Sequence, residues 1–505
     1  MSPNPSTPRV VPLQLGPEEF RRIGHDLVDR IAGFLNAVPE GPVTPGDPPS
    51  TIRGLLGTRS LPAKGESAET LLQASSELLF GHSLLNGHPR FWGYITSPPA
   101  PIGILADFLA AAVNPNVGAY ILSPVATEIE RQTIQWIAEL IGFPASCGGV
   151  LVSGGNMANF VGFLTARAAK GGATVKSDGL HGHAPLRAYA SAAVHTWTQK
   201  ASDLFGLGAE NVRYIPVDRE QRIDTKALRQ RILTDREAGD RPFLVVGTAG
   251  SVGTGSIDAL PDLAEICREF DLWFHVDGAY GGLAACLPDA PTDLKGLSQA
   301  DSVAIDPHKW LYAPLEAGCV LVRDPAKLSE TFSYHPDYYR MDDVGGEQPL
   351  NFVDYGPQNS RGFRALKVWL ALQHAGRDGY QRMIGDDVAL AQALHRLVEE
   401  HPRLETGTQS LSITTFRYVP DDLASSPPSD DEYLNQLNEK ILTRMQEEGE
   451  AFVSNAVVEG RYLLRACIVN FNTTHDDLVA LIELTDRLGR EIHEARDTAS
   501  DNHRG

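Results

Sequence analysis

The sequence is poor in cysteine, in long apolar runs and in basic residues relative to acidic ones. Its 505 residues include five cysteines, and no two of them form a Cys-x-x-Cys pair. Because several of them lie in apolar runs, we expect reduced core thiols and no disulfide framework. No run of about 20 apolar residues exists, and the N-terminus lacks a charged-then-apolar signal pattern. We therefore expect a soluble, cytoplasmic protein without a membrane partner.

The charge balance argues against polyanionic partners. The chain has 44 Lys and Arg residues against 64 Asp and Glu residues, which gives a formal net charge of −20. Such a charge disfavours nucleic acid and anionic membrane surfaces, although it allows a local basic pocket for a phosphate. We expect no metal site.

The most informative segment is Asp-Pro-His-Lys-Trp at 306–310, which follows the apolar run 303–305. This run predicts a buried strand, so Lys309 should lie at a strand end. An unpaired ammonium there would lose its hydration, which is unfavourable. Tying the amine up as a Schiff base avoids this loss, and lysine forms such bonds with carbonyl substrates and with pyridoxal phosphate (PLP). For a lysine considered alone, a structural ion pair is the alternative.

A second strand ends at Asp277, one crossover before Lys309. Residues 272–276 are mostly apolar and β-prone, which predicts a central parallel strand. Open α/β sheets bind ligands at the carboxyl ends of their strands. A carboxylate there would keep the pyridine nitrogen of PLP protonated, which makes the ring an electron sink. Asp277 could instead only cap the next segment, but a lysine at the following strand end weakens that interpretation.

The segment 149–159 predicts a strand, a glycine turn and then a helix from about Asn156 to Lys170. Backbone N–H groups at such a turn, together with a helix N-terminus, attract an anion such as a phosphate. No Gly-Lys-Ser/Thr follows, so a Walker-type nucleotide site is disfavoured. Ser153 does not lie in Gly-x-Ser-x-Gly, so it is a poor candidate for a hydrolase nucleophile.

Taken in order, these motifs resemble the group II PLP-dependent amino-acid decarboxylases, and most closely their aromatic-L-amino-acid branch. The matching segments are 88–91, 123–128, 153–159, His195, 275–280, 306–310 and 361–369. The resemblance implies the PLP-dependent transferase-like α/β fold (aspartate aminotransferase fold type I). Such a fold has a mostly parallel central sheet with helices on both faces, and a smaller C-terminal α/β domain. It also implies a homodimer with the site between subunits.

Three parts of the chain are expected. Residues 1–85 form an N-terminal helical segment that packs on the dimer partner, 86–380 form the large PLP-binding domain, and 381–505 form the small domain. Residues 17–38 predict an amphipathic helix, whose apolar stripe could instead pack within one subunit. Strands are expected at 149–152, 212–216, 243–247, 272–276, 303–305, 319–322, 411–418 and 462–471.

The resemblance assigns roles around the PLP ring by position. Lys309 is implied to bind the cofactor covalently, and Asp277 to pair with the pyridinium nitrogen. His195 is implied to stack over one face of the ring, while Ala279 lies under the other. An ordinary half-buried histidine is the alternative for His195.

The phosphate of PLP is implied to lie at Gly155 and Asn156, with help from His308 or Asp306. Asp306 departs from the family, which often has Asn before Pro-His-Lys. Its additional negative charge near a phosphate must be offset, or it must point elsewhere.

The implied proton donor to the substrate Cα is Tyr338, with Tyr339 as a one-residue register alternative. In the family, changes of the loop tyrosine or of the stacking histidine divert the reaction to aldehyde formation. Both residues are present here, which favours simple decarboxylation. Arg361 or Arg364 is a further candidate for holding a carboxylate or the phosphate, and a solvated arginine is the alternative.

The resemblance also suggests residues of the substrate pocket. Tyr94, Ser97 and Tyr120 are candidates for lining it. Two family aromatic positions are Ile95 and Leu315 in this chain, which puts a catecholic substrate in doubt.

The sequence thus predicts a PLP-dependent carboxy-lyase that converts an L-amino acid, with an aromatic one favoured, to the amine and CO2 through a Schiff base with the substrate. An aldehyde synthase on the same scaffold is the first alternative. A protein that binds PLP or an amino acid without turnover is the second.

Overall fold

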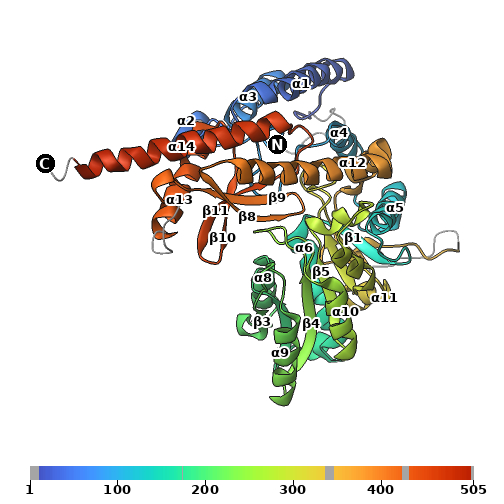
Figure 1. The fold of residues 1–505 in the computed structure, drawn as a ribbon. Helices are drawn as coiled ribbons and strands as arrows, with labels where there is room; N and C mark the ends of the chain where they lie inside the picture. Colours follow the sequence, from blue (N-terminus) through green and yellow to red (C-terminus); the bar gives the residue numbers. More distant parts are fainter. Residues whose placement is uncertain (1–10, 173, 336–345, 424–430, 502–505) are drawn as a thin grey trace, which may run out of the picture.

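The computed structural model describes residues 11–172, 174–335, 346–423 and 431–501. Figure 1 shows a large sheet with its helices in green and yellow, a smaller sheet in orange and red, and N-terminal helices in blue beside the smaller sheet's helices. No helix in the described part of the chain combines the length and apolar character needed to cross a membrane.

The helices of the N-terminal and large parts are α1 (Pro17–Ala37), α2 (Pro49–Leu56), α3 (Ala68–His82), α4 (Pro101–Val113), α5 (Pro124–Leu140), α6 (Gly155–Lys170), α7 (Val175–Asp178), α8 (Trp197–Leu204), α9 (Thr225–Glu237), α10 (Leu260–Glu269) and α11 (Ala326–Phe332). They are followed by α12 (Ala365–Glu400), α13 (Asp431–Glu448) and α14 (His475–Asp501).

The large sheet is mostly parallel, as predicted. Its strands are β1 (Gly148–Val152), β2 (Leu186–Ser191), β3 (Val212–Ile215), β4 (Arg241–Thr248), β5 (Trp273–Asp277), β6 (Ser302–Ile305) and β7 (Gly318–Val322). Their spatial order is β1-β7-β6-β5-β4-β2-β3, and β7 runs antiparallel to both neighbours. The sequence did not predict β2, because its alanines and Arg187 give it a weak β signal.

Helices cover both faces of this sheet. An added Cβ on Gly162 of α6 would lie 2.6 Å from the ring of His275 in β5. An added Cβ on Gly247 of β4 would lie 2.7 Å from Leu260 of α10. Gly247 pairs with Val276, the neighbour of His275. Because neighbouring strand residues point to opposite faces, α6 and α10 cover opposite faces, as the fold class requires.

The smaller sheet is antiparallel and has its own core. Its strands are β8 (Leu404–Ser410), β9 (Ile413–Tyr418), β10 (Ser454–Val458) and β11 (Arg461–Cys467), in the order β10-β11-β9-β8. Helices α12, α13 and α14 pack against them. The sequence predicted a segment that contains β9 and one that overlaps β11. It missed β8 and β10, which lie at the sheet edges and carry few buried side chains.

Helix α12 runs through the predicted domain boundary at 380/381 without an interruption there. A left-handed residue, Gly376 with φ 67°, lies within this helix instead. Ile384 belongs to the core of the large sheet, whereas Ala391 belongs to the core of the small one. The division into three parts therefore stays a prediction, with one helix shared by two cores.

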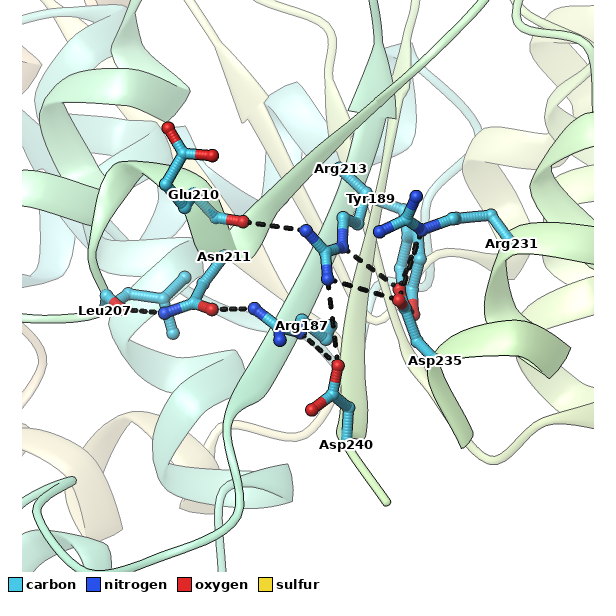
Figure 2. Close-up of polar contacts among 9 residues, drawn as sticks. All are labelled: Arg187, Tyr189, Leu207, Glu210, Asn211, Arg213, Arg231, Asp235 and Asp240. Atoms are coloured by element: carbon cyan, nitrogen blue, oxygen red, sulfur yellow. Dashed lines mark hydrogen bonds and ion pairs between the residues drawn. The ribbon is translucent and has the colours of Figure 1, made fainter. Parts of the chain in front are cut away.

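A charged network joins α9 to β2 and β3 at the outer edge of the large sheet (Figure 2). Asp235 of α9 accepts hydrogen bonds from Tyr189 (2.9 Å), Arg213 (3.2 Å) and Arg231 (3.1 Å). Burial alone would raise the pKa of Asp235, but these donors lower it overall. Arg187 binds Asp240 in the same way. Because the charges pair with one another, we assign the network a structural role.

Arg361 belongs to a buried ion pair and does not face the cofactor region. Its guanidinium contacts Glu130 and also donates to the carbonyl oxygens of Leu151 and Val117, both at 2.7 Å. Arg364, the other sequence candidate, pairs with Glu316 at the surface.

Substituting methionine for Arg361 should destabilise the protein by about 3–5 kcal/mol, because Glu130 would stay buried without its cation. The free energy of unfolding in urea measures this. A double change of Arg361 to Met and Glu130 to Gln should recover part of the loss. Equal stability of the wild type and the Arg361 variant would contradict the assigned role.

Candidate active site

A cavity of about 490 Å³ lies at the carboxyl ends of β4, β5 and β6 and at the N-terminus of α6. All eight residues that the sequence assigned to the cofactor line it: Gly155, Asn156, His195, Asp277, Ala279, Asp306, His308 and Lys309. They come from segments far apart in the chain, and the parallel strand order brings them to one edge of the sheet.

Lys309 lies in the turn that follows β6, and its amine contacts a carboxylate. The Nζ of Lys309 is 3.2 Å from Oδ2 of Asp306, whose side chain is only 2% exposed. The second oxygen of Asp306, Oδ1, has no hydrogen-bond partner among the described residues. The amine thus forms the ion pair that the sequence left as the alternative. The pair nevertheless lines the cavity.

Asp277 ends β5 as a buried carboxylate. Its Oδ2 accepts a hydrogen bond from Nε1 of Trp197 at 2.7 Å, and its Oδ1 accepts one from the backbone of Ala279 at 3.2 Å. No cation lies within 4 Å of it among the described residues. A buried anion without a cation is unfavourable. This site therefore fits a ligand that brings a positive charge, such as a protonated ring nitrogen.

The glycine turn leaves backbone room where a phosphate would bind. Gly154 has φ 150°, and a Cβ there would lie 3.2 Å from Cε1 of His308. A Cβ on Gly155, the first residue of α6, would lie 2.6 Å from Oδ2 of Asp306. The helix N-terminus and the imidazole suit an anion, and Lys309 offsets the charge of Asp306. The residues present therefore fit PLP.

His195 lies on the cavity wall just before α8. Burial lowers the pKa of its imidazole, although the nearby Asp277 carboxylate acts in the opposite direction. Its Nδ1 accepts a hydrogen bond from the backbone of Trp197 at 3.3 Å. A neutral ring with its proton on Nε2 is thus favoured, which suits a planar group that covers another ring.

Comparison with known proteins decides the family. Residues 49–419 match the model of the pyridoxal-dependent decarboxylase conserved domain. The chain belongs to the pyridoxal-dependent decarboxylase family. It is therefore a PLP-dependent carboxy-lyase that acts on an amino acid.

Relatives of this decarboxylase match it along nearly its whole length. It is 33% identical to an aromatic-L-amino-acid decarboxylase from Bacillus atrophaeus, with 95% of this chain and 97% of the relative covered. It is 31% identical to a phenylacetaldehyde synthase from Petunia hybrida, with 90% and 91% covered. The structure of Oryza sativa TDC with PLP and tryptamine superposes with a TM-score of 0.88 at 26% identity, with 96% and 100% covered.

The substrate candidates of the decarboxylase divide between three places. Tyr94 lines the cavity beside Ile95 and Leu315. Ser97 does not line it. Instead its hydroxyl donates to the backbone oxygen of His308 at 3.1 Å, so it supports the turn that carries Lys309. Tyr120 lines a separate hollow with Val125 and Glu128. Tyr338 and Tyr339 lie outside the described residues.

Sequence reasoning missed several residues of this site. Trp197 holds Asp277, and Thr96 and Thr248 add buried hydroxyl oxygens without a hydrogen-bond partner among the described residues. Thr248 had a usable signal, because it directly follows the predicted strand 243–247. In the structure it ends β4 and pairs in register with Asp277. Trp197 had no comparable signal, since its contact to Asp277 joins residues that are distant in the chain.

His275 packs behind the cofactor cavity, and its burial predicts that the folded protein loses stability in acid. It is fully buried between Asn159 (2.7 Å) and Ser302 (2.8 Å), and burial lowers the pKa of its imidazole from 6.5 to about 4. The unfolded chain therefore binds more protons below pH 6.5, and stability should fall as the pH drops from about 6.5 toward 4.

Urea unfolding midpoints at pH 7.5 and pH 5 test this sign. A His275→Gln variant, which cannot gain the proton, should lose less stability over that interval than the wild type does. An equal loss in both proteins would assign the acid sensitivity to other groups.

Proposed function

We propose that this decarboxylase acts on an aromatic L-amino acid and releases CO2 and the corresponding amine. The charged groups of the cavity wall gather in the segment around Lys309 and at Asp277. The remaining described wall includes Tyr94, Ile95 and Leu315 and has no arginine or further lysine. An acidic side chain would find no cation there other than Lys309 itself. An uncharged, largely apolar side chain is therefore the best fit.

Each residue of the cavity has its own role in this reaction. When bound, PLP supplies an electron sink for the electron pair left behind as the bond between Cα and the carboxylate breaks. Asp277 keeps the proton on the ring nitrogen. Lys309 holds the coenzyme between turnovers through its Nζ, and the neutral His195 covers the ring and excludes water.

After CO2 has left, a proton must be delivered to Cα before water or oxygen reacts there. We assign this step to the hydroxyl of Tyr338, with Tyr339 as the register alternative. The sequence match supports the assignment. A Tyr338→Phe variant compared with Tyr339→Phe distinguishes the two, because only the donor's loss should shift product from amine toward aldehyde.

A screen of the proteinogenic L-amino acids tests the proposal. CO2, amine, aldehyde and hydrogen peroxide should all be measured for each substrate. CO2 and amine in equal amounts from an aromatic substrate support the proposal, and CO2 release only from acidic substrates would overturn it. The relative from Petunia hybrida makes aldehyde synthase the second candidate, which peroxide and aldehyde would reveal. No turnover of any substrate would favour the non-catalytic binder.

The enzyme also acts as a homodimer in this proposal. Exposed apolar side chains gather on α4 and in the segment that leads into α5: Leu105, Phe108, Leu109, Val113, Ile121, Leu122 and Val125, all more than half exposed. On α1, Phe20 is 55% exposed and only Ile23 is buried. A second copy would cover these surfaces. Tyr120 precedes Ile121 on this surface and lines a hollow separate from the cavity of its own chain, so we propose that it contributes to the partner's cavity.

Light scattering at micromolar concentration tests the assembly. A dimer is expected, and an Ile121→Glu variant should weaken it, whereas Leu204→Glu, at an exposed position on α8, should not. A monomeric wild type would contradict the proposal.

The reduced cysteines expected from the sequence agree with a cytoplasmic location, since all five are free.

A further inference from the structure

A buried carboxylate of α12 lies behind the turn that carries Lys309. Asp387 is 2% exposed, and its Oδ2 accepts hydrogen bonds from Nε1 of Trp310 at 2.7 Å and from the hydroxyl of Tyr312 at 2.6 Å. Its Oδ1 faces the backbone N–H of Asn470 at 3.4 Å. No cation lies within 4 Å of Asp387 among the described residues. A carboxylate buried in this way depends on its hydrogen-bond donors for stabilisation of its charge.

The two side-chain donors flank Lys309 in the sequence. Trp310 follows it directly, and the backbone N–H of Tyr312 bonds to the carbonyl oxygen of Lys309 at 3.1 Å. Tyr312 has φ 54°, a left-handed conformation that is unfavourable for a bulky residue. Both side chains are fully buried. The surroundings, and Asp387 foremost, must therefore hold this turn in shape.

The same support reaches the segment that follows Asp277. The ring of Trp310 stacks on Tyr280, with centroids 4.9 Å apart. The hydroxyl of Tyr280 in turn bonds to Ser412, just before β9, at 2.7 Å. The two turns that carry Lys309 and Asp277 thus rest on one packed group, which α12 and the small sheet hold from behind.

From this geometry we propose that Asp387 is a positioning residue for Lys309. Its ionised carboxylate holds Trp310 and Tyr312, and so it fixes the direction in which the Lys309 amine enters the cavity. Hydrogen bonds to an ionised acceptor are about twice as strong as neutral ones, so an amide at this position would hold the turn less firmly. The inference rests on the proposed role of Lys309.

The strength with which Asp387 holds Trp310 and Tyr312 should depend on pH. Burial raises the pKa of Asp387 to about 7, while the bonds from Tyr312, Trp310 and Asn470 act in the opposite direction and the exposed Asp386 adds to the rise. The titratable groups around it are Tyr312, Asp386 and the buried Cys467. Protonation of Asp387 as the pH falls through about 7 removes the charge from the acceptor. The turn should then loosen.

The main experiment compares wild-type and Asp387→Asn holoenzyme from pH 6 to 9. It measures kcat, KM and the circular dichroism band of the bound cofactor. At pH 8 we expect about a tenfold lower kcat in the variant, a KM within about twofold, and an altered dichroism band. The wild-type step near pH 7 should be absent from the variant. His195 and His308 also lie in the cavity. A pH step of the wild type is therefore assigned to Asp387 only if the Asp387→Asn substitution removes it.

Asp386→Asn is the matched control, since it removes the neighbouring exposed charge and should leave kcat at pH 8 unchanged. The pH step should persist and move to slightly lower pH, because the Asp386 charge contributes to the raised pKa of Asp387. If Asp387→Asn does not fold, Tyr312→Phe replaces it. This variant removes one donor to the carboxylate, so the step should move to higher pH and kcat should fall.

Wild-type values of kcat, dichroism and pH step in Asp387→Asn would overturn the inference, and so would an unchanged step in Tyr312→Phe. Failure of the proposed role of Lys309 is distinguishable, because turnover retained in a Lys309→Ala variant would reveal it. The dichroism of the cofactor bound to Asp387→Asn would still report orientation in that case.

Discussion

Replacing Lys309 with alanine should leave a folded protein without measurable decarboxylation. The amine is the group that holds the coenzyme aldehyde covalently, and no other lysine lines the cavity among the described residues. Purified wild-type protein should show an absorbance band of the bound cofactor near the visible edge. Borohydride reduction should then attach the cofactor permanently to the chain. The variant should not retain label after reduction and denaturation. Normal steady-state rates would contradict the role of Lys309.

Two controls separate chemistry from stability in this variant. Removal of the amine leaves the buried Asp306 without the cation that lies 3.2 Å away, so some loss of stability is expected. Adding Asp306→Asn should restore the urea midpoint but not the turnover. Lys200→Ala, at an exposed position on α8, should retain both activity and borohydride labelling.

The Asp277→Asn variant should weaken both PLP binding and turnover. The buried carboxylate has hydrogen bonds but no cation within 4 Å in the described part of the chain, so the ring nitrogen is its natural counter-charge. Breaking a buried charge pair costs about 3–5 kcal/mol, which corresponds to a loss of about a hundredfold or more in PLP affinity. Turnover should fall further even at saturating PLP, because an unprotonated ring is a weaker electron sink.

Titration of apoenzyme with PLP, followed by its absorbance, measures the affinity. Asp301→Asn provides the control, because this carboxylate accepts from the backbone of Phe274 at 2.8 Å near the opposite end of β5. An amide can replace it there, so affinity and rate should stay near those of the wild type. If Asp277→Asn retained wild-type affinity and rate, the pairing with the ring nitrogen would be wrong.

The sequence located the cofactor residues because local rules apply to them. Apolar runs that end at Asp277 and before Lys309 predict parallel strands, and parallel strands end at one edge of a sheet. The glycine turn before α6 follows a similar local rule. These segments therefore meet in the structure as expected, whereas the roles of individual side chains stay predictions.

The sequence could not assign the partners of the buried charges. Nothing local distinguishes Arg361, which pairs with Glu130 in the core, from an arginine that binds a ligand. Nothing local indicates that Ser97 bonds to the backbone of His308, or that Tyr120 lines a hollow separate from the cavity.

By itself, then, the sequence determined the class of fold, the coenzyme and the order in which the reactive residues reach the sheet edge, because strand ends and turns follow from short-range patterns. Only the tertiary structure decided which charge neutralises which. It placed Asp306 against Lys309 and Asp387 behind the turn that carries that lysine. Such contacts depend on how distant segments pack, because a buried charge pairs with a group that the packing places within bonding distance.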